Sequence, residues 1–407
     1  MKKEKEDVLH LSKEDRKEIK DIQVFLPDYI PEKIFVRHEF EDFFLSFSNM
    51  LDKPGMGIFL ITGHRGSGKT LLAKTMTLRF SHMGKPAYYI DGMSYSNTKK
   101  ILKHLLLQRE EDYNILFDSF RQHVKSFNDF GVPVSLFIDN TQFLKDFDIF
   151  EYFLRNPQYN FKIVVLSVND VWFYPLSKKV GKANVERIDF KDYTYDDLFQ
   201  ILTYRADRGL ISSHSRSLLI LSTFIAKEYK GNASLAIRVL PRIASSGWPD
   251  DMEKVAEIVK RFIDEDISDM LSTLPERDLI VLFSLIYESD AKAIFPVSSR
   301  FANEFLNYNL PYDRVKSALS DLVNRGLVIY TYSSEGDGQK KQRQSLIIKI
   351  MFDRKLIVME VTKRYGSVLR NVINDPTNQV GSLIRSHNSF NYFKHFFLGE
   401  GSDIFNR

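Results

Sequence analysis

The stretch that decides the fold is "IFLITGHRGSGKTLLAKTMTLRF", residues 58–80. An apolar, β-prone run comes first, then a glycine-rich turn, then a segment whose apolar residues have helical spacing. The turn has the pattern of glycine, four residues, then Gly-Lys-Thr. Such a turn cradles phosphates, because glycines let backbone N–H groups converge and a following helix N-terminus favours negative charge. A chance glycine-rich turn is the other interpretation, and the Lys-Thr pair in register with strand and helix argues against it.

This loop predicts a nucleotide site with bound Mg²⁺. Lys69 is expected to reach the β- and γ-phosphates, and the Thr70 hydroxyl is expected to bind Mg²⁺. Asp139 ends the apolar run "SLFID", where a carboxylate can hold the Mg²⁺ shell; an ordinary helix cap is its alternative role. The side chains of His64 and Arg65 are expected to face solvent or a partner. The predicted ligands of ATP or ADP are Gly63, His64, Arg65, Gly66, Ser67, Gly68, Lys69, Thr70, Leu71 and Asp139.

Apolar strands alternate with helical segments through the first half of the chain. Five strands are expected, at residues 58–62, 87–91, 134–139, 162–167 and 186–190. This alternation is typical of a parallel sheet covered by helices on both faces, so the predicted fold class is α/β. The nucleotide-binding core is assigned to residues 25–192, after a charged lead over residues 1–24.

The second half is predicted to be mainly helical. Segments with helical periodicity fill residues 193–271 and predict a helical lid over the core. Helices at about 276–288, 298–307 and 312–325 then precede a hairpin with arms "LVIYTYS" and "SLIIKIMF". This order of elements is that of a winged-helix domain, assigned to residues 272–353, and residues 354–407 form a C-terminal extension.

Composition limits the classes of function that remain. The 407 residues are 43% hydrophobic and include 57 basic and 53 acidic side chains, a formal charge of +4 that permits a nucleic-acid partner without demanding one. Cysteine is absent, which excludes disulfides and thiolate metal sites. The nine histidines show no metal-ligand spacing, and no apolar run approaches the roughly 20 residues of a membrane span. We therefore expect a soluble, cytoplasmic protein with no membrane partner.

From about Phe25 to Phe352 the chain resembles the AAA+ family, and within it the archaeal origin-recognition initiators of the Orc-one/Cdc-six type. The resemblance is carried, in this order, by "YIPEKIFVRHEF", "GHRGSGKT", "SLFIDN", "VLSVND", "RIDFKDYTYDDLFQILTYRAD", "YKGNASLAIRVLPRIA" and the winged helix. It implies an AAA+ core with a helical lid, bound ATP or ADP with Mg²⁺, and double-stranded DNA as a partner. Other initiator subunits or a replicative helicase are further implied partners, with a location at the nucleoid.

Three departures from the family pattern fall on residues that act in hydrolysis. Asn140 stands where the family has a glutamate, and an amide cannot serve as a general base, although it can orient water. The lid motif Gly-Asp-Ala-Arg is replaced by "GNAS", which puts Ser234 in place of the arginine, with Arg238 one helical turn further on. The arginine after the fourth strand is replaced by lysines in "PLSKKVGKANV". Because general acid–base catalysis contributes about 10²–10⁴-fold, weak or absent hydrolysis is expected.

Two asparagines are the candidates for catalytic contacts. Asn140 follows the Mg²⁺-binding aspartate directly. Asn169 ends "VVLSVN", where an amide can contact the γ-phosphate or orient water, and a turn-forming Asn-Asp pair is an equal alternative.

Two groups of residues are the predicted DNA contacts. In winged helices the third helix enters the major groove and the hairpin reaches the backbone or minor groove. The predicted contacts are Arg314, Lys316 and Ser317 in that helix, and Lys340, Lys341 and Arg343 in "GQKKQRQ" of the hairpin. The competing interpretation is that these are solvated charges, diluted by Asp313 and Asp321, in a domain that binds protein.

Three hypotheses about function remain. The leading one is an ATP-binding, DNA-binding protein of the replication-initiator type with poor hydrolysis. The second is a DNA-stimulated cycling ATPase, such as a loader or a transposition-type target selector, which requires Asn140 or another residue such as Asp146 to serve in hydrolysis. The third is a protein-binding subunit of a replication complex, to which the aromatic stretch "FNYFKHFF" gives some support.

Overall fold

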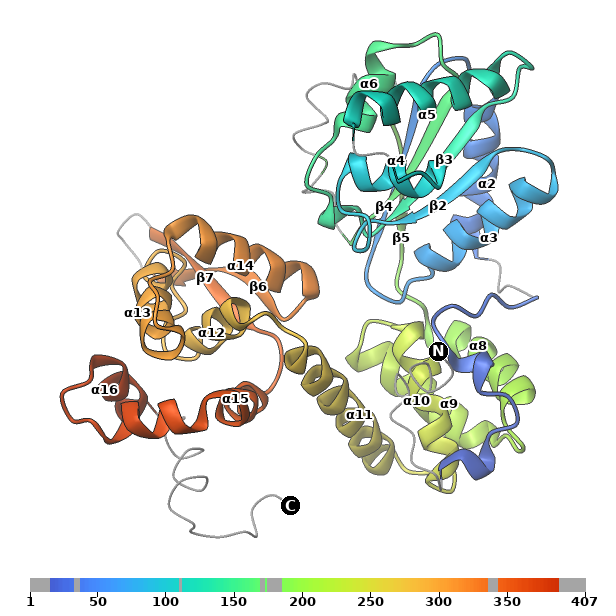
Figure 1. The fold of residues 1–407 in the computed structure, drawn as a ribbon. Coiled ribbons are helices and arrows are strands. Elements are labelled where there is room, and N and C mark those ends of the chain that lie inside the picture. Colours follow the sequence, from blue (N-terminus) through green and yellow to red (C-terminus); the bar gives the residue numbers. More distant parts are fainter. Residues whose placement is uncertain are drawn as a thin grey trace. The chain divides into compact units, whose positions relative to one another are not determined.

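The computed structural model describes residues 15–32, 37–109, 112–168, 173, 185–335 and 343–387. The chain divides into two compact units, Met1–Val259 and Lys260–Arg407. The first contains the sheet, and the second contains a hairpin surrounded by helices (Figure 1). The division falls within helix α11, Met252–Ser272, and the helix ends at the residue where the winged-helix domain assigned from the sequence begins.

The first unit is built on a five-stranded parallel sheet. Its strands are β1 (Gly57–Gly63), β2 (Ala87–Asp91), β3 (Val134–Asp139), β4 (Phe161–Leu166) and β5 (Val185–Phe190). They lie in the order β2-β3-β4-β1-β5, with every neighbouring pair parallel. All five predicted strands are confirmed to within one residue at each end. The central strand β1 leads directly into the glycine-rich loop.

Helices cover both faces of the sheet (Figure 1). One face carries α2 (His38–Leu51) and α3 (Lys69–His82), and the other carries α4 (Thr98–Leu106), α5 (Tyr113–Asn128) and α6 (Asp148–Arg155). Because side chains alternate along a strand, Phe59 and Ile61 of β1 pack toward α2 and α3, whereas Ile58 and Leu60 join the opposite core. This two-sided burial explains why the central strands β1, β3 and β4 are apolar along most of their length.

The lid segment is helical, as the sequence predicts. It comprises α8 (Tyr195–Gly209), α9 (Ser215–Glu228), α10 (Ala233–Ser245) and the start of α11. A capping box begins α8: the Thr194 hydroxyl accepts from the Asp197 backbone N–H at 3.2 Å, and the Asp197 carboxylate accepts from the Thr194 N–H at 2.9 Å.

The described part of the charged N-terminal lead is attached to these helices. Two 3₁₀ turns, η1 (Asp15–Glu18) and η2 (Ile22–Phe25), lie against α8 and α10. The Lys20 backbone N–H donates to the Gly209 carbonyl at 2.9 Å. Phe25 is fully buried, and its ring leaves no space for a side chain at position 209. The lead therefore forms part of the lid packing.

In the second unit, three helices precede an antiparallel hairpin. They are α12 (Glu276–Ser284), α13 (Ile294–Leu306) and α14 (Tyr312–Arg325), followed by β6 (Val328–Glu335) and β7 (Arg343–Ile350). This is the order that the sequence predicts for a winged helix. The extension continues as α15 (Arg354–Asn374) and α16 (Gln379–Ser386), which share one apolar core with the preceding helices. No helix in the described part of the chain is long and apolar enough to cross a membrane.

Candidate nucleotide site and nucleic-acid interface

The glycine-rich loop forms a cradle between β1 and α3. Gly66 and Gly68 have left-handed backbone angles, with φ of 78° and 95°. A Cβ at Gly66 would lie 2.0 Å from the Asn232 side-chain oxygen, and one at Gly68 would lie 2.6 Å from the Tyr193 hydroxyl. The first N–H groups of α3 have no partner inside their own helix and are available to an anion. The cradle therefore fits a phosphate and excludes side chains.

Lys69 extends back along this loop. Its ammonium donates to the carbonyls of Gly63 at 2.7 Å and His64 at 2.9 Å, and it lies 3.3 Å from the Ser67 hydroxyl. Burial lowers the pKa of Lys69 to about 8, and the charge of Asp139 offsets part of this effect. A polyphosphate in the cradle would favour the protonated form, because an opposite charge nearby stabilises a buried ammonium.

The predicted Mg²⁺ ligands are brought together at the ends of β3 and the loop. The Thr70 hydroxyl donates to Asp139 Oδ2 at 2.5 Å, and Asp139 is only 3% exposed. The other carboxylate oxygen accepts from the Asn140 backbone N–H at 2.8 Å. Two hard oxygen ligands beside a phosphate cradle match the preference of Mg²⁺ for few carboxylates plus substrate phosphates. The residues present fit the nucleotide and its metal ion.

Two residues of β2 join this site, Tyr89 in its middle and Asp91 at its end, and sequence reasoning missed both. The Tyr89 hydroxyl donates to Asp139 Oδ2 at 3.2 Å, and its pKa is raised by burial and then by the Asp139 charge. Asp91 faces Asp139 across the β2–β3 pair and accepts from Asn140 Nδ2 at 2.9 Å. The carboxyl ends of parallel strands lie at the same edge of a sheet. The matching acidic ends of "AYYID" and "SLFID" were therefore the sequence signal that Asp91 lies near Asp139.

The lid touches the phosphate loop through the first turn of α10. The Ala233 backbone N–H donates to the Gly66 carbonyl at 3.3 Å, and Asn232 caps the helix by accepting from the Leu235 N–H at 3.0 Å. Ser234 is exposed and Arg238 is half-buried one turn later. Asn169, the other candidate catalytic residue, lies outside the described residues.

Arg37, just before α2, is a third residue that sequence reasoning missed. Its guanidinium donates to the Ser67 carbonyl of the loop at 3.0 Å and to the Lys191 carbonyl at 2.9 Å. It also pairs with Glu39 at 2.9 Å and lies 4.2 Å from the centre of the Tyr193 ring. The residue is recognisable only in three dimensions, because its contacts are far apart in the sequence.

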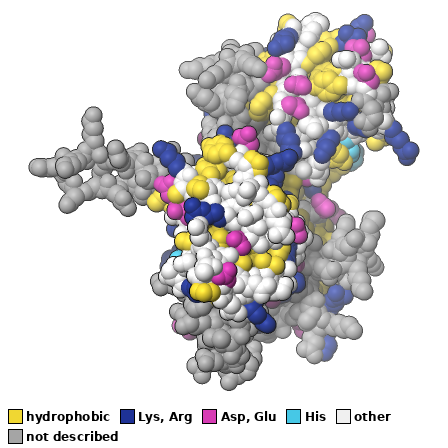
Figure 2. All heavy atoms as spheres, turned by 60° about the vertical axis from the view of Figure 1, so that its left-hand side comes forward, with side chains coloured by type: hydrophobic (Ala, Val, Ile, Leu, Met, Phe, Trp, Pro, Cys, Tyr) yellow, Lys and Arg dark blue, Asp and Glu magenta, His cyan; other side chains and the backbone are white. Residues whose placement is uncertain are grey.

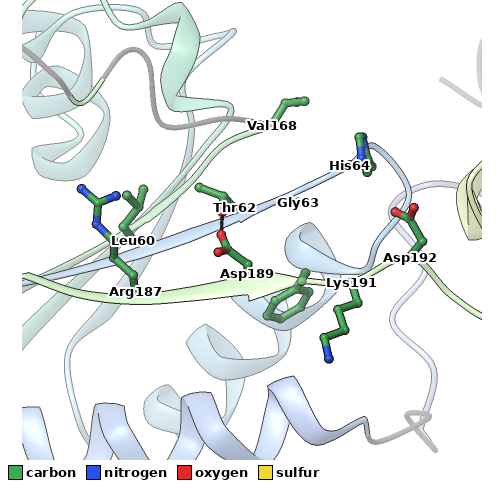
Figure 3. A pocket seen from close by; sticks show the side chains of 10 residues that line it. Leu60, Thr62, Gly63, His64, Val168, Arg187, Asp189, Lys191 and Asp192 are labelled. Carbon is green, nitrogen blue, oxygen red and sulfur yellow. Dashed lines mark hydrogen bonds between the residues drawn. The ribbon is translucent and has the colours of Figure 1, made fainter.

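A hollow of about 640 Å³ lies beside the start of the loop, over β1 and β5 (Figure 3). Thr62 and Asp189 are hydrogen-bonded in its middle. Arg187 lies toward one end, and His64 and Asp192 lie toward the other. His64 is thus an exposed lining residue of a polar hollow, and side chains of both signs line it.

In the second unit, α14 presents the predicted DNA contacts at its surface. Arg314, Lys316 and Ser317 are all exposed, while the helix packs inward through other residues. Asp321, which was expected to dilute the positive charge, lies 3.2 Å from the guanidinium of Arg277. That ion pair reduces the negative field on the helix.

The hairpin contacts fall largely outside the structure's described part. Lys340 and Lys341 lie outside the described residues, and Arg343 begins β7 with a side chain that is not described. On the face drawn in Figure 2, the coloured Lys and Arg side chains lie scattered among acidic and apolar ones.

No cluster of three metal-ligating His, Asp or Glu side chains occurs within the described ranges. A family model described as an AAA domain matches residues 53–171. No curated protein matches the chain.

Solved structures match over most of the chain. The Aeropyrum pernix ORC1 protein, in complex with DNA, is 18% identical with a TM-score of 0.62, over 88% of this chain and 100% of that one. The Aeropyrum pernix ORC2 protein, in ADPNP-ADP complexes, is 19% identical with a TM-score of 0.51, over 87% and 100% of the two chains. Together with the loop geometry and strand order, these likenesses show that the chain has the α/β P-loop fold of AAA+ proteins, as found in the Aeropyrum pernix ORC1 protein.

Proposed function

We propose that this protein binds ATP and double-stranded DNA in the manner of a replication initiator, and that it holds its nucleotide with slow or absent hydrolysis. The observation that carries the proposal is the contrast within one site. Lys69, Thr70 and Asp139 converge for binding, whereas Asn140 offers no carboxylate for catalysis.

Each residue has a separate task in this proposal. The loop N–H groups and Lys69 would bind the phosphates, and Thr70 and Asp139 would hold Mg²⁺, which neutralises charge on the phosphate oxygens when bound. Asn140 can orient a water molecule by hydrogen bonding but cannot remove its proton. Contact between α10 and the loop would then make the lid sense the nucleotide. Binding energy would be used to organise the unit, and turnover would be slow.

The DNA half of the proposal rests on α14 and on the compared structures. One of them, at 18% identity, is an ORC1 protein in complex with DNA, and another is an ORC2 protein with adenine nucleotides. In this chain, the exposed Arg314 and Lys316 stand on the helix that enters the major groove in winged-helix proteins. Other initiator subunits or a helicase would be further partners.

Nucleotide retention is the first test. Purified protein loaded with radiolabelled ATP and Mg²⁺ is expected to retain intact ATP for hours, with or without duplex DNA. Lys69→Ala should lower the affinity for ATP by at least about tenfold, because the buried ammonium contacts the loop and would neutralise phosphate charge. Lys85→Ala, which changes an exposed lysine after the same helix, is the matched control. Brisk turnover by the wild type would instead favour the cycling ATPase.

DNA binding is the second test. Arg314→Ala with Lys316→Ala should weaken duplex binding and lower the slope of log affinity against log salt by about 1 to 2. Lys363→Ala with Arg370→Ala removes two exposed cations from α15 and should leave that slope unchanged. Equal effects of the two pairs would favour the hypothesis of a protein-binding subunit with solvated surface charges.

A further inference from the structure

Two acidic strand ends lie side by side at the candidate site. β2 and β3 are paired in parallel register, so that Asp91 stands opposite Asp139. The backbone continues this contact, because the Gly92 N–H donates to the Asp139 carbonyl at 2.8 Å. A Cβ at Gly92 would lie 2.8 Å from the Asn140 carbonyl oxygen. The end of β2 is therefore pressed against the residue that stands where the AAA+ pattern has its catalytic glutamate.

The side chain of Asn140 is turned toward β2. Its Nδ2 donates to Asp91 Oδ1 at 2.9 Å. An ionised carboxylate only accepts hydrogen bonds, so this contact fixes which end of the amide faces Asp91. Within the described residues, Oδ1 of Asn140 has no hydrogen-bond partner. The amide oxygen is consequently the group left to meet a ligand.

Both partners are held in place by their own backbones. Asn140 has a left-handed φ of 53°, and its N–H and carbonyl are bonded to Asp139 Oδ1 and to the Phe143 N–H. Asp91 accepts from the Met93 N–H at 3.1 Å and from the Ser94 hydroxyl at 2.8 Å. Asp91 would have to break its own turn to move away from position 140.

We propose that Asp91 is a positioning residue that orients Asn140 as a hydrogen-bond acceptor and excludes a carboxylate from position 140. The inference rests on the proposed nucleotide site. It makes Asp91, besides Asn140, a cause of slow ATP hydrolysis there. A glutamate introduced at position 140 would face the Asp91 carboxylate, and like charges on neighbouring strands repel. Restoring the family's glutamate alone would then not restore hydrolysis. Both positions must change together.

Four proteins test the pair: wild type, Asn140→Glu, Asp91→Asn and the double variant. Asp91→Asn keeps an oxygen for the Met93 N–H and removes the charge. In the nucleotide-free proteins, Asn140→Glu should lower the melting temperature of the first unit by about 2–4 °C, and adding Asp91→Asn should recover most of that loss. With ATP and Mg²⁺, the double variant should hydrolyse about 10²-fold faster than wild type, and Asn140→Glu at most about tenfold faster.

Asp112→Asn combined with Asn140→Glu is the matched control. Asp112 also accepts backbone N–H groups, at the start of α5, but does not contact Asn140. This control should behave as Asn140→Glu alone. The proposal is overturned if Asn140→Glu alone is as fast as the double variant, or if Asp91→Asn recovers no stability. Failure of all four proteins to bind a fluorescent ATP analogue would refute the proposed function separately, because the melting measurement needs no nucleotide.

Discussion

The residue tolerated at a glycine position depends on which atoms pack against it. Gly66 and Gly84 both have left-handed backbones, with φ of 78° and 70°. Only Gly66 is also crowded, by the Asn232 side chain at the start of α10, whereas nothing lies within 4 Å of a Cβ at Gly84. Substitutions at the two positions therefore distinguish the cost of a strained backbone from the cost of losing the contact between the lid and the loop.

Gly66→Ala should weaken ATP binding by at least about tenfold and lower the melting temperature of the first unit more than Gly84→Ala does. Both variants carry the cost of a left-handed alanine, about 1–2 kcal/mol, but only Gly66→Ala displaces Asn232. Nucleotide titration and thermal unfolding of both variants provide the measurements. Equal losses of stability and affinity would mean that the lid contact contributes nothing.

The arrangement of the loop residues was predictable at the residue scale because their sequence pattern is local. Lys69, Thr70 and Asp139 follow from the motif and from one strand end, and the structure places them together. Arg37 was not predictable, since nothing in its neighbouring residues indicates the carbonyls that it meets. For Asp91, "AYYID" indicates a polar strand end but not the amide of Asn140 that it meets. Such contacts depend on register and helix placement.

At the scale of elements, β4 contains an unexpected buried charge. Lys162 is fully buried, and its ammonium donates to the carbonyls of Lys53 at 2.6 Å and Gly55 at 2.8 Å, in the segment between α2 and β1. Burial, and then the charge of Lys53, lowers the pKa of Lys162 to about 8. The Lys162 side chain thus hydrogen-bonds β4 to the segment that leads into β1.

The free energy of unfolding should rise with pH above about 8. Folded Lys162 loses its proton near pH 8, whereas the unfolded chain keeps it to about 10.5, so the unfolded state binds more protons in that window. Lys69 contributes in the same direction. In Lys162→Met the slope should fall by up to about 1.4 kcal/mol per pH unit. Urea unfolding between about pH 7 and 10 measures the slope of the unfolding free energy against pH, with Lys85→Met as control. Equal slopes in Lys162→Met and wild type would show that Lys162 is not the titrating group.

Strands were easier to predict than helix boundaries. The central strands β1, β3 and β4 are buried on both faces and stand out as apolar runs between polar segments. The helix predicted at 298–307 instead spans Ile294–Leu306 and contains Pro296 in its first turn. The predicted start is four residues too late, and the proline is tolerated because a first-turn residue needs no intrahelical N–H bond.

At the scale of the whole molecule, the two units should respond differently to nucleotide. All the candidate phosphate and Mg²⁺ ligands lie in Met1–Val259, and the candidate DNA helix lies in Lys260–Arg407. A ligand that binds only the folded form stabilises the unit that holds it. The sequence predicted both groups of residues but not the position at which the chain divides, within α11.

ATP with Mg²⁺ at about 100 times its dissociation constant should stabilise the first unit by about 2.7 kcal/mol, or roughly 5–10 °C. The melting transition of the second unit should not move. Differential scanning calorimetry resolves the two transitions, and Lys69→Ala should abolish the shift. A shift of both transitions by the same amount would show instead that the units unfold together.

The packing of Phe25 against Gly209 has a consequence for how fragments of this protein should be produced. A fragment cut to begin at α2 would contain the whole sheet, yet it would leave an empty apolar socket on α8 where Phe25 now sits. Such a fragment is expected to accumulate in inclusion bodies, because exposed apolar surface promotes self-association. A fragment that begins before Asp15 keeps the socket filled and is the sounder choice for expression and crystallisation.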